Sequence, residues 1–384
     1  MKELNPSKLK ETLEARADSD IRLWNIGGAA MAVSQHGEQV CGLYRGYKNT
    51  ETKEPLCPGT IFRLASMTKP VTGLACLIGL ERGWFRLDDK VSGYFPAFGK
   101  MSVGKLAENG TPVPARAAEK DVLIWHLLTH TSGIVTSDEL GLRQDALTPP
   151  SVRTSLESAV DYYGKNTYLS FEPGEKTSYS GYAAFDIAAR LIEIKSGMRY
   201  ADFVRKNIFK PLGIADITFA PTNEQWGRMI AMCDRAVNGL VTVNMGSHTF
   251  EQCPLSYTCA GASLAGSLED YLVFAEMLRR GGEYNGARIV SPELVRLMRR
   301  PYVPDGTPGL SDTQSWGLGV RVTLRDTVLP AGCFGWSGAY GTHFWVDPEN
   351  DITAVYMKNM RWFDSHGGGN TGRQFERDVM SALE

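Results

Sequence analysis

The sequence contains no hydrophobic run long enough to cross a membrane. Its longest apolar stretches, such as residues 73–80, fall well short of the roughly 20 residues that a transmembrane helix needs. Residues 2–20 are polar and favour a helix, and they lack the apolar segment and the small-residue cleavage site of a signal peptide. We therefore expect no membrane span and a cytoplasmic location, unless an exported protein has had its leader trimmed.

Cysteine is scarce, and positive charge is not in excess. The cysteines are Cys41, Cys57, Cys76, Cys233, Cys253, Cys259 and Cys333. Their odd number and the lack of a CxxC pair favour reduced thiols over a disulfide framework. Lysine and arginine together number 41 against 43 acidic residues, whereas a nucleic-acid-binding protein usually shows a basic excess or stripe. We therefore expect no nucleic-acid partner.

What the sequence does contain is the composition of an ordinary globular protein. Hydrophobic residues make up 43% and charged residues 22% of its 384 residues. This length exceeds that of a usual single domain, so we expect two lobes or one elaborated domain with an ample core.

The hydrophobic pattern predicts strands near both ends of the chain and helices between them. Two β-prone runs, residues 29–33 and 39–44, surround His36-Gly37 and indicate a hairpin. The predicted helices are residues 71–82, 122–128, 182–195, 200–209, 268–280, 291–299 and a last one from Arg373. The later predicted strands are residues 316–324, 341–347 and 352–357.

Both ends of the chain are therefore predicted to share one sheet. Residues 1–65 and 260–384 would form a discontinuous α/β lobe, and residues 66–259 an inserted, mainly helical lobe. We expect the active site in the cleft where the two lobes meet.

The tetrapeptide at residues 66–69, Ser-Met-Thr-Lys, matches Ser-x-x-Lys. This spacing places a hydroxyl and an amine on one helix face, because residues three apart are neighbours there. The same spacing occurs at residues 7–10 and 102–105, in polar surroundings that we interpret as flexible. Ser66 instead opens an apolar helix, whose N-terminus stabilises negative charge, and Pro70 is tolerated so close to a helix start. Ser66 is our candidate nucleophile, with a helix-capping serine as the alternative.

Further short sequence motifs follow Ser66 in a recognisable order. Residues 125–133 spell Trp-His-Leu-Leu-Thr-His-Thr-Ser-Gly, and Pro-Gly at 173–174 precedes Ser-Tyr-Ser-Gly at 178–181. Pro-Leu-Gly-Ile at 211–214 and Trp-Ser-Gly at 336–338 complete the series. This order resembles that of class C β-lactamases, DD-peptidases and family VIII carboxylesterases over nearly the whole chain. The resemblance implies a mixed α/β fold of the β-lactamase/transpeptidase type, with an antiparallel sheet flanked by helices and an inserted helical lobe.

The resemblance also implies roles for individual residues. In such enzymes the lysine of the first motif and the tyrosine of the second lie within hydrogen-bond reach of the serine, and these positions fall on Lys69 and Tyr179. We predict Ser66, Lys69 and Tyr179 as the catalytic residues, and the sequence leaves open which of the last two takes the proton. By the same analogy, the backbone N–H groups of Ser66 and Ala339 would form the oxyanion hole.

The third motif differs from that of β-lactamases and bears on the substrate. Those enzymes usually carry Lys-Thr-Gly, whose cation meets the substrate carboxylate, whereas this chain has Trp336, Ser337 and Gly338. Tryptophan offers an indole N–H and a ring face but no formal charge. Class C enzymes also have an amide-binding asparagine at the position of Gly181. We assign these four residues to substrate binding and expect neutral esters rather than β-lactams; for Trp336, a core position is the alternative.

Other sequence patterns give weaker evidence of function. Residues 335–339 lack the last glycine of Gly-x-Ser-x-Gly. Residues 367–372 match GxGxxG, but too little chain follows for a dinucleotide fold, so we interpret them as a loop. His126 and His130 lack the glutamate of a metal-binding helix, and we expect no metal and no cofactor. For His343, which follows the third motif, we favour a structural role over one at the cleft.

The sequence therefore predicts a serine hydrolase that forms an acyl-enzyme on Ser66, with a carboxylesterase of small neutral esters as the leading hypothesis. Its predicted partner is a small-molecule ester or amide. The alternatives are a β-lactamase or DD-peptidase, a D-amino-acid amidase or peptidase, an acyltransferase, and a non-catalytic penicillin-binding relative. The sequence specifies neither the acyl group nor the oligomeric state.

Overall fold

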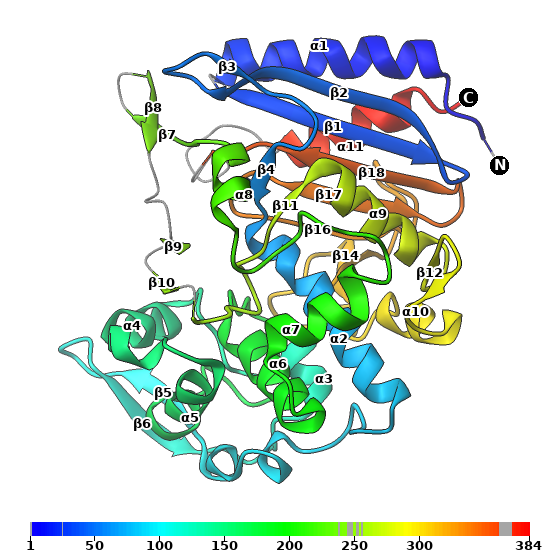
Figure 1. The fold of residues 1–384 in the computed structure, drawn as a ribbon. Coiled ribbons are helices and arrows are strands. Elements are labelled where there is room, and N and C mark those ends of the chain that lie inside the picture. The colour runs from blue at the N-terminus through cyan, green and yellow to red at the C-terminus, as the bar shows by residue number, and fades with distance from the viewer. Residues whose placement is uncertain are drawn as a thin grey trace.

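An eight-stranded antiparallel sheet joins the two ends of the chain (Figure 1). The computed structural model describes residues 2–24, 26–236, 239–243, 249–250, 253–254, 256–360 and 371–384. The strand order is β14-β15-β16-β17-β18-β1-β2-β3, and β1 pairs with β18 so that Gln35 lies opposite Ile352. The predicted fold class, with a sheet shared by both ends of the chain, is thereby confirmed. The strands are β1 (Gly28–Gln35), β2 (Glu38–Asn49), β3 (Glu54–Pro55), β14 (Gln314–Trp316), β15 (Arg321–Thr323), β16 (Phe334–Ser337), β17 (His343–Asp347) and β18 (Ile352–Met357).

The hairpin of β1 and β2 turns at the predicted dipeptide. His36 and Gly37 both have positive φ values, 54° and 84°, which a tight two-residue hairpin turn of the primed type requires. Alternating side chains of β1 face opposite sides of the sheet, and all eight residues are buried. Both faces of the sheet are therefore covered.

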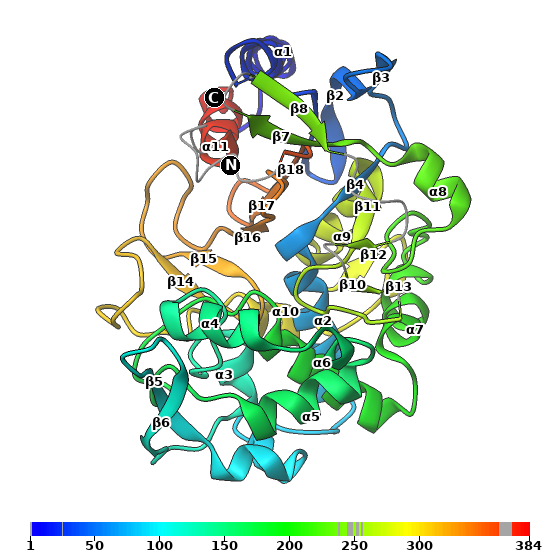
Figure 2. The same ribbon diagram turned by 90° about the vertical axis from the view of Figure 1, so that its left-hand side faces the viewer.

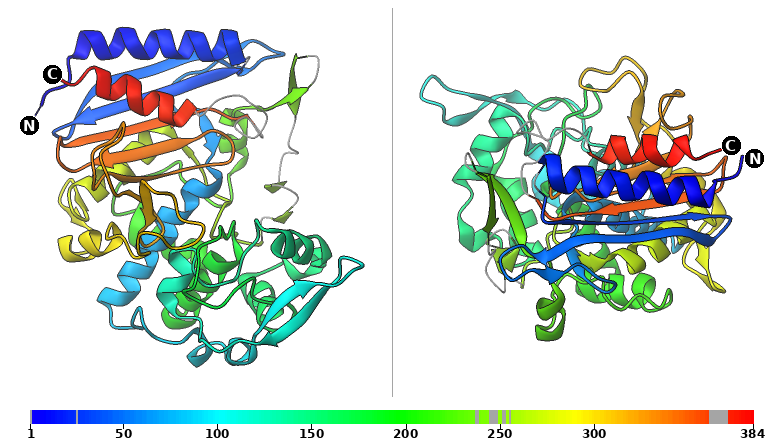
Figure 3. Two further views of the ribbon diagram at one scale, coloured as in Figure 1. Left: turned by 180° about the vertical axis from the view of Figure 1, so that it is seen from behind. Right: turned by 90° about the horizontal axis from the view of Figure 1, so that it is seen from above.

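Helices cover the two faces of the sheet. On one face, α1 (Pro6–Trp24) and α11 (Thr371–Ser381) lie side by side (Figure 3). Leu9 and Leu13, one turn apart on α1, are fully buried in a cluster that includes Trp345 and Phe375. The other face packs on α9 (Leu268–Arg279), whose contacts reach β17 and β18.

The helices between the two sets of strands form the second half of the molecule. Figure 2 shows α2 running between the sheet and this half, and every residue of α2 from Lys69 to Gly79 is buried. Gly73 allows α2 to lie against Leu318, since a Cβ there would stand 2.3 Å from the Leu318 carbonyl oxygen. The helices are α2 (Lys69–Glu81), α3 (Ile124–Leu128), α4 (Glu139–Leu147), α5 (Leu156–Asn166), α6 (Ala183–Ser196), α7 (Tyr200–Val204), α8 (Asn223–Arg228) and α10 (Pro292–Met298). None of the helices in the described part of the chain is long and apolar enough to cross a membrane.

Short strand pairs accompany these elements. None of these pairs was part of the sequence-based prediction, and the pair of β5 with β6 bears on it. Residues 102–105 lie on β5 and residues 7–10 on α1, so the prediction that both lie in flexible segments was wrong. The short strands are β4 (Ile61–Arg63), β5 (Ser102–Leu106), β6 (Pro112–Ala117), β7 (Met232–Ala236), β8 (Gly239–Val243), β9 (Thr249–Phe250), β10 (Cys253–Pro254), β11 (Ala265–Ser267), β12 (Glu283–Tyr284) and β13 (Ala287–Arg288).

The strand predicted at residues 316–324 is in fact two strands. β14 and β15 pair with each other across a reversal at residues 317–320. Gly319 has a φ of 78°, a conformation that few other residues adopt at low cost. The glycine-rich loop predicted at residues 367–372 lies outside the described residues as far as position 370, and α11 includes its last two residues.

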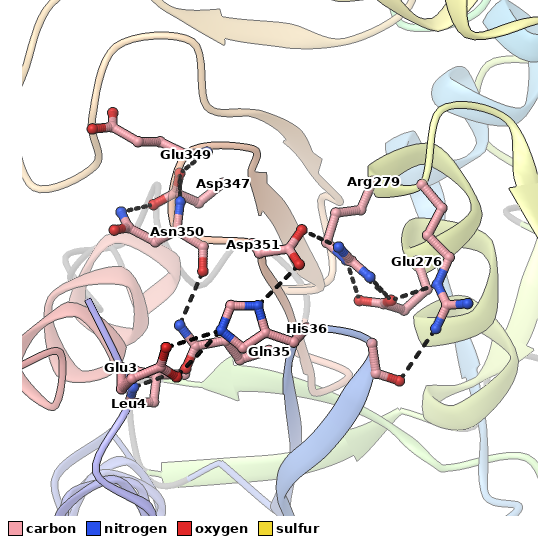
Figure 4. Close-up of polar contacts among 12 residues, drawn as sticks. Glu3, Leu4, Gln35, His36, Glu276, Arg279, Asp347, Glu349, Asn350 and Asp351 are labelled. Atoms are coloured by element: carbon pink, nitrogen blue, oxygen red, sulfur yellow. Dashed lines mark hydrogen bonds and ion pairs between the residues drawn. The ribbon is translucent and has the colours of Figure 1, made fainter. Parts of the chain in front are cut away.

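A cluster of charged residues ties the N-terminus to the sheet and to α9 (Figure 4). The two ring nitrogens of His36 lie 3.1 Å from an Asp351 carboxylate oxygen and 3.2 Å from Glu3. Asp351 also pairs with Arg279, which bonds Glu276 on its own helix. The hydrogen bonds with Asp351 and Glu3 raise the pKa of His36 above its ordinary value.

Candidate active site

Ser66 lies in a tight turn between β4 and α2. The backbone N–H of Leu64 donates to the Leu264 carbonyl at 2.9 Å, which ties this turn to the segment before β11. Ala65 has a φ of 46°, and the Thr68 hydroxyl holds its carbonyl at 2.7 Å. A non-glycine residue in this conformation is strained, and such strain persists only where the surrounding structure enforces it. The residue before the candidate nucleophile is therefore held in a defined position.

Lys69 is the first residue of α2, and its side chain is fully buried. Its Nζ donates to Ser66 Oγ at 3.2 Å and to the carbonyl oxygens of Gly181 at 2.6 Å and Gly261 at 2.9 Å. A buried amino group needs such hydrogen-bond partners. The sequence contained no motif that pointed to Gly261, since its contribution is a backbone carbonyl.

Tyr179 approaches Ser66 from the segment before α6. Its hydroxyl donates to Ser66 Oγ at 2.7 Å, and Lys69 Nζ lies 4.7 Å from the centre of its ring. The structure thus brings the three residues of the predicted catalytic set together around one oxygen atom. Ser66 itself is partly exposed, so that a substrate can reach it.

His130 supports the segment that carries Tyr179. Its Nδ1 accepts the Ser180 N–H at 3.0 Å, and its carbonyl accepts the Ser178 N–H at 3.0 Å. Burial, together with the charge of Lys69, holds the pKa of His130 well below its ordinary value, so the ring is neutral. His126 likewise accepts a backbone N–H, that of Leu123, at 3.0 Å. Both rings therefore accept hydrogen bonds from nearby backbone N–H groups.

Trp336 forms an aromatic wall beside Tyr179. The two rings are stacked with their centres 5.9 Å apart, and the ring centres of Trp316 and His130 lie 4.7 Å and 5.9 Å from that of Trp336. Trp336 is 7% exposed, and its indole N–H has no hydrogen-bond partner among the described residues. The third motif therefore places an uncharged ring, with one unused donor, next to the candidate catalytic tyrosine.

Beyond Trp336, the chain passes close to the nucleophile. The Gly338 N–H donates to the Thr342 carbonyl at 2.7 Å, and a Cβ on Gly338 would stand 2.3 Å from the Leu64 carbonyl oxygen. Only glycine allows this approach. In the described part of the chain, the backbone N–H groups of Ser66 and Ala339 have no hydrogen-bond acceptor, and their assignment to the oxyanion hole stays a prediction.

Gly181 lies between Thr136 and Lys69. Its N–H donates to the Thr136 hydroxyl at 2.6 Å, while its carbonyl accepts from Lys69. A Cβ at this position would stand 2.9 Å from the same hydroxyl oxygen, so an asparagine here would require Thr136 to move. The local structure is therefore built around the glycine.

His343 links the third motif to the C-terminal helix. Its ring is buried, with Nδ1 2.8 Å from the hydroxyl of the exposed Ser337 and Nε2 3.0 Å from Glu376 of α11. Arg321 on β15 lies 3.3 Å from the same Glu376 oxygen. Ser337 and Glu376 are far apart in the sequence, and no sequence motif predicted that His343 would connect them.

Asp186 lies on α6, behind Lys69, and sequence reasoning missed it. Its carboxylate accepts the Ala260 N–H at 2.9 Å and the Tyr257 hydroxyl. It therefore anchors the segment whose Gly261 carbonyl accepts from Lys69. Burial raises the pKa of Asp186 to about 7, although the hydrogen bonds from Tyr257 and Ala260 oppose the rise.

The sequence and the fold both match known proteins. The family model described as Beta-lactamase matches residues 21–370. Esterase EstB from Burkholderia gladioli is 28% identical over 392 aligned positions, covering 93% of this chain and 92% of EstB.

Two solved structures show the same fold. EstCE1, described as a hydrolase with promiscuous acyltransferase activity, superposes with a TM-score of 0.78 at 22% identity and covers 98% of both chains. Unliganded simvastatin synthase LovD from Aspergillus terreus superposes with a TM-score of 0.75 at 21% identity and covers 97% of both chains.

Proposed function

Because the chain belongs to the β-lactamase family, we propose that it is a carboxylesterase that forms an acyl-enzyme on Ser66 and acts on small neutral esters. The observation that carries the proposal is the convergence of Lys69 Nζ and the Tyr179 hydroxyl on Ser66 Oγ, at 3.2 Å and 2.7 Å. The esterase relative, which covers most of the chain, supports the same reaction class.

The contacts of Lys69 suit either of two ways of activating the serine. As a neutral amine, Lys69 would donate its two N–H groups to the carbonyls of Gly181 and Gly261 and direct its lone pair at Ser66 Oγ. As an ammonium, it would stabilise a Tyr179 phenolate that accepts the serine proton. In both cases the pair carries one proton fewer than its fully protonated form, and the serine proton moves onto the pair as Oγ attacks the carbonyl carbon.

The attack creates a negative oxygen that requires donors. The unused N–H groups of Ser66 and Ala339 are our candidates for this oxyanion hole. Collapse of the tetrahedral intermediate expels the alcohol, which takes its proton from the Lys69–Tyr179 pair. Water then enters by the same route and releases the acid.

The uncharged side chain at position 336 favours a neutral substrate. The position at which β-lactamases carry a lysine is occupied by Trp336, whose ring stacks on Tyr179. A substrate carboxylate that enters a partly dry cleft loses hydration, and an uncharged indole does not replace it. For this reason we place ester hydrolysis ahead of β-lactam hydrolysis.

Acyl transfer to an alcohol is the second candidate, and the aromatic wall favours it. Trp316, which is partly exposed, lies in one aromatic cluster with Tyr179 and Trp336, and its ring is a surface on which an alcohol acceptor can pack in competition with water. A hydrolase and a transferase share the acyl-enzyme and differ in the acceptor alone.

A turnover panel tests the proposal. It consists of p-nitrophenyl esters of increasing chain length beside nitrocefin and D-alanyl amides, each with and without an added alcohol. We expect turnover of the esters, and Ser66→Ala is expected to abolish it while leaving the fold intact. Mass spectrometry after treatment with a fluorophosphonate should show a single adduct on Ser66, and a label on another residue would contradict the assignment.

A further inference from the structure

Two backbone carbonyls from different segments direct the buried amino group of Lys69. Its Nζ donates to the Gly181 oxygen at 2.6 Å and to the Gly261 oxygen at 2.9 Å, and an amine and an ammonium can both do so. The two segments touch, since a Cβ on Gly261 would stand 2.5 Å from the Gly181 oxygen. A lysine side chain is long and flexible, so the position of this amine depends on how the two carbonyls are held.

On the α2 side, Thr72 holds the carbonyl of Ala260, the residue before Gly261. Thr72 lies one turn after Lys69 and is fully buried. Its hydroxyl donates to the Ala260 oxygen at 2.6 Å. Since this uses its only proton, the Tyr200 hydroxyl at 2.7 Å must be the donor to Thr72 Oγ1. The Ala260 carbonyl is thereby tied to the helix that carries Lys69.

On the α6 side, Asp186 holds the N–H of the same residue. Its side chain is fully buried, and Oδ1 accepts the Ala260 N–H at 2.9 Å. A carboxyl oxygen can accept this N–H whether or not the group is ionised. The other oxygen, Oδ2, is hydrogen-bonded to the Tyr257 hydroxyl. Both polar backbone groups of Ala260 are thus bonded to buried side chains, one from α2 and one from α6.

Ala260 therefore links the acceptors of Lys69 to the helices around them. The helices α2 and α6 pack against each other, α2 begins at Lys69, and α6 begins two residues after Gly181. Because Gly261 directly follows Ala260, both contacts of Ala260 oppose a shift of the Gly261 carbonyl. The distance between the Lys69 amine and this acceptor thus depends on two side chains outside the catalytic set.

We propose that Thr72 and Asp186 are positioning residues: they fix the carbonyl that directs the Lys69 amine at the nucleophile. This inference rests on the proposed esterase function and adds two residues on which its proton-transfer step depends. Loss of either contact leaves the three catalytic side chains present but allows the amine to leave its position. A displacement of about 1 Å from a change outside the reacting groups can cost about a hundredfold in rate.

Paired variants at each position test the role. Thr72→Val removes the donor and Thr72→Ser restores it, while Asp186→Leu removes the acceptor and Asp186→Asn keeps a carbonyl oxygen for the Ala260 N–H. Thr72→Val and Asp186→Leu should each lower kcat and kcat/KM for p-nitrophenyl butyrate by the same factor, about tenfold to a hundredfold, because the misplaced amine serves both acylation and deacylation. Thr72→Ser and Asp186→Asn should stay within about threefold of the wild type. All rates are expressed per active site, counted from the end point of fluorophosphonate labelling.

Asp20→Leu is the matched control for the loss of a buried aspartate. Asp20 is buried and accepts from the Tyr356 hydroxyl at 2.9 Å, but it lies on α1, across the sheet from α9. This variant should lower the melting temperature and leave the rate per active site unchanged. If Thr72→Val and Asp186→Leu behave in the same way, their role is structural and the inference is overturned. Should Asp186→Leu fail to fold, the comparison of Thr72→Val with Thr72→Ser decides.

The wild type distinguishes the two proposals. If it hydrolyses the ester and both members of each variant pair have equal rates, the positioning role alone is overturned. If it hydrolyses no ester but fluorophosphonate labels Ser66, the esterase function is wrong, and the labelling rates of the same variants, expected to fall by the same factor, test the positioning role. Absence of both turnover and labelling would overturn both proposals.

Discussion

Lys69 and Tyr179 contact the same atom, Ser66 Oγ, so their substitutions are expected to affect one proton-transfer step. Lys69→Ala and Tyr179→Phe should each lower kcat/KM for a p-nitrophenyl ester by about a hundredfold or more, the usual contribution of acid–base catalysis. The double variant should lose little beyond either single variant, because groups that act as a unit show non-additive losses. Strictly additive losses in this cycle would count against a shared role.

Trp336 provides a second test at the same scale. Trp336→Lys would place an ammonium near the substrate and should improve the kcat/KM of nitrocefin relative to p-nitrophenyl butyrate by about tenfold to a hundredfold, since a hydrogen bond to a charged group contributes roughly 1.5–3 kcal/mol. Absolute rates should fall for both substrates, because the ring that stacks on Tyr179 is lost. Trp336→Phe keeps an aromatic ring without the charge and is the matched control. Equal losses for both substrates in the lysine variant would show that charge at this position does not set the preference.

Residue types with a fixed spacing could be predicted from the sequence, and contacts between distant segments could not. Ser66 and Lys69 are one helical turn apart, and Tyr179 belongs to a motif that follows them in the order seen in related enzymes. Gly261 contributes only a carbonyl, which any residue carries. Asp186 and Glu376 lie on ordinary amphipathic helices, where nothing local distinguishes a buried carboxylate with a role from a solvated one.

At the scale of elements, Asp186 holds α6 to the segment at residues 257–261. Its pKa is raised to about 7 by burial, whereas in the unfolded chain it is near 4. Its stabilising contribution is therefore complete below about pH 4 and is lost as the pH rises through about 7. Between about pH 5 and about pH 8, the wild type should lose on the order of 2 kcal/mol of unfolding free energy relative to Asp186→Asn, which does not titrate there. Urea unfolding of both proteins at the two pH values measures this difference, and parallel profiles would contradict it.

The hairpin of β1 and β2 carries a second titrating group. The pKa of His36 is raised by Asp351 and Glu3, so its stabilising effect is present at low pH and is lost as the pH rises above that raised value. His36→Asn keeps a residue that tolerates positive φ. The melting temperature of the wild type should exceed that of this variant by more at about pH 6 than at about pH 9. Glu3→Gln, which removes one of the two partners, should weaken the pH dependence, and an equal gap at both pH values would contradict the assignment.

Elements with a strong local pattern were predicted closely, and short ones were not. The hairpin turn at His36-Gly37 and the helices α2, α6 and α9 follow from turn chemistry and periodicity. The reversal between β14 and β15 was missed because its strands are three residues long and form an unbroken run with the turn. The pair β5 and β6 was missed because most of its residues are polar or exposed, so these segments lack a clear hydrophobic alternation. The two strands are held in place by their pairing with each other.

At the scale of the whole molecule, the candidate site draws on both halves. Ser66 and Lys69 belong to the turn and helix that run between the sheet and the helices, Tyr179 comes from the helical half, and Trp336 is on a sheet strand. Changes in how the two halves pack would therefore alter distances around Ser66 Oγ directly. We expect substitutions at Gly73, where α2 touches Leu318, to reduce activity together with stability.

The pairing of β1 with β18 also has a consequence for synthesis of the chain. Gln35 leaves the ribosome about 300 residues before its partner Ile352, which corresponds to about 15–60 seconds at the usual rate of about 5–20 residues per second. For that time the edge of β1 that receives β18 is unpaired, and unpaired strand edges promote aggregation. The nascent polypeptide is therefore expected to depend on chaperones until its last strands emerge.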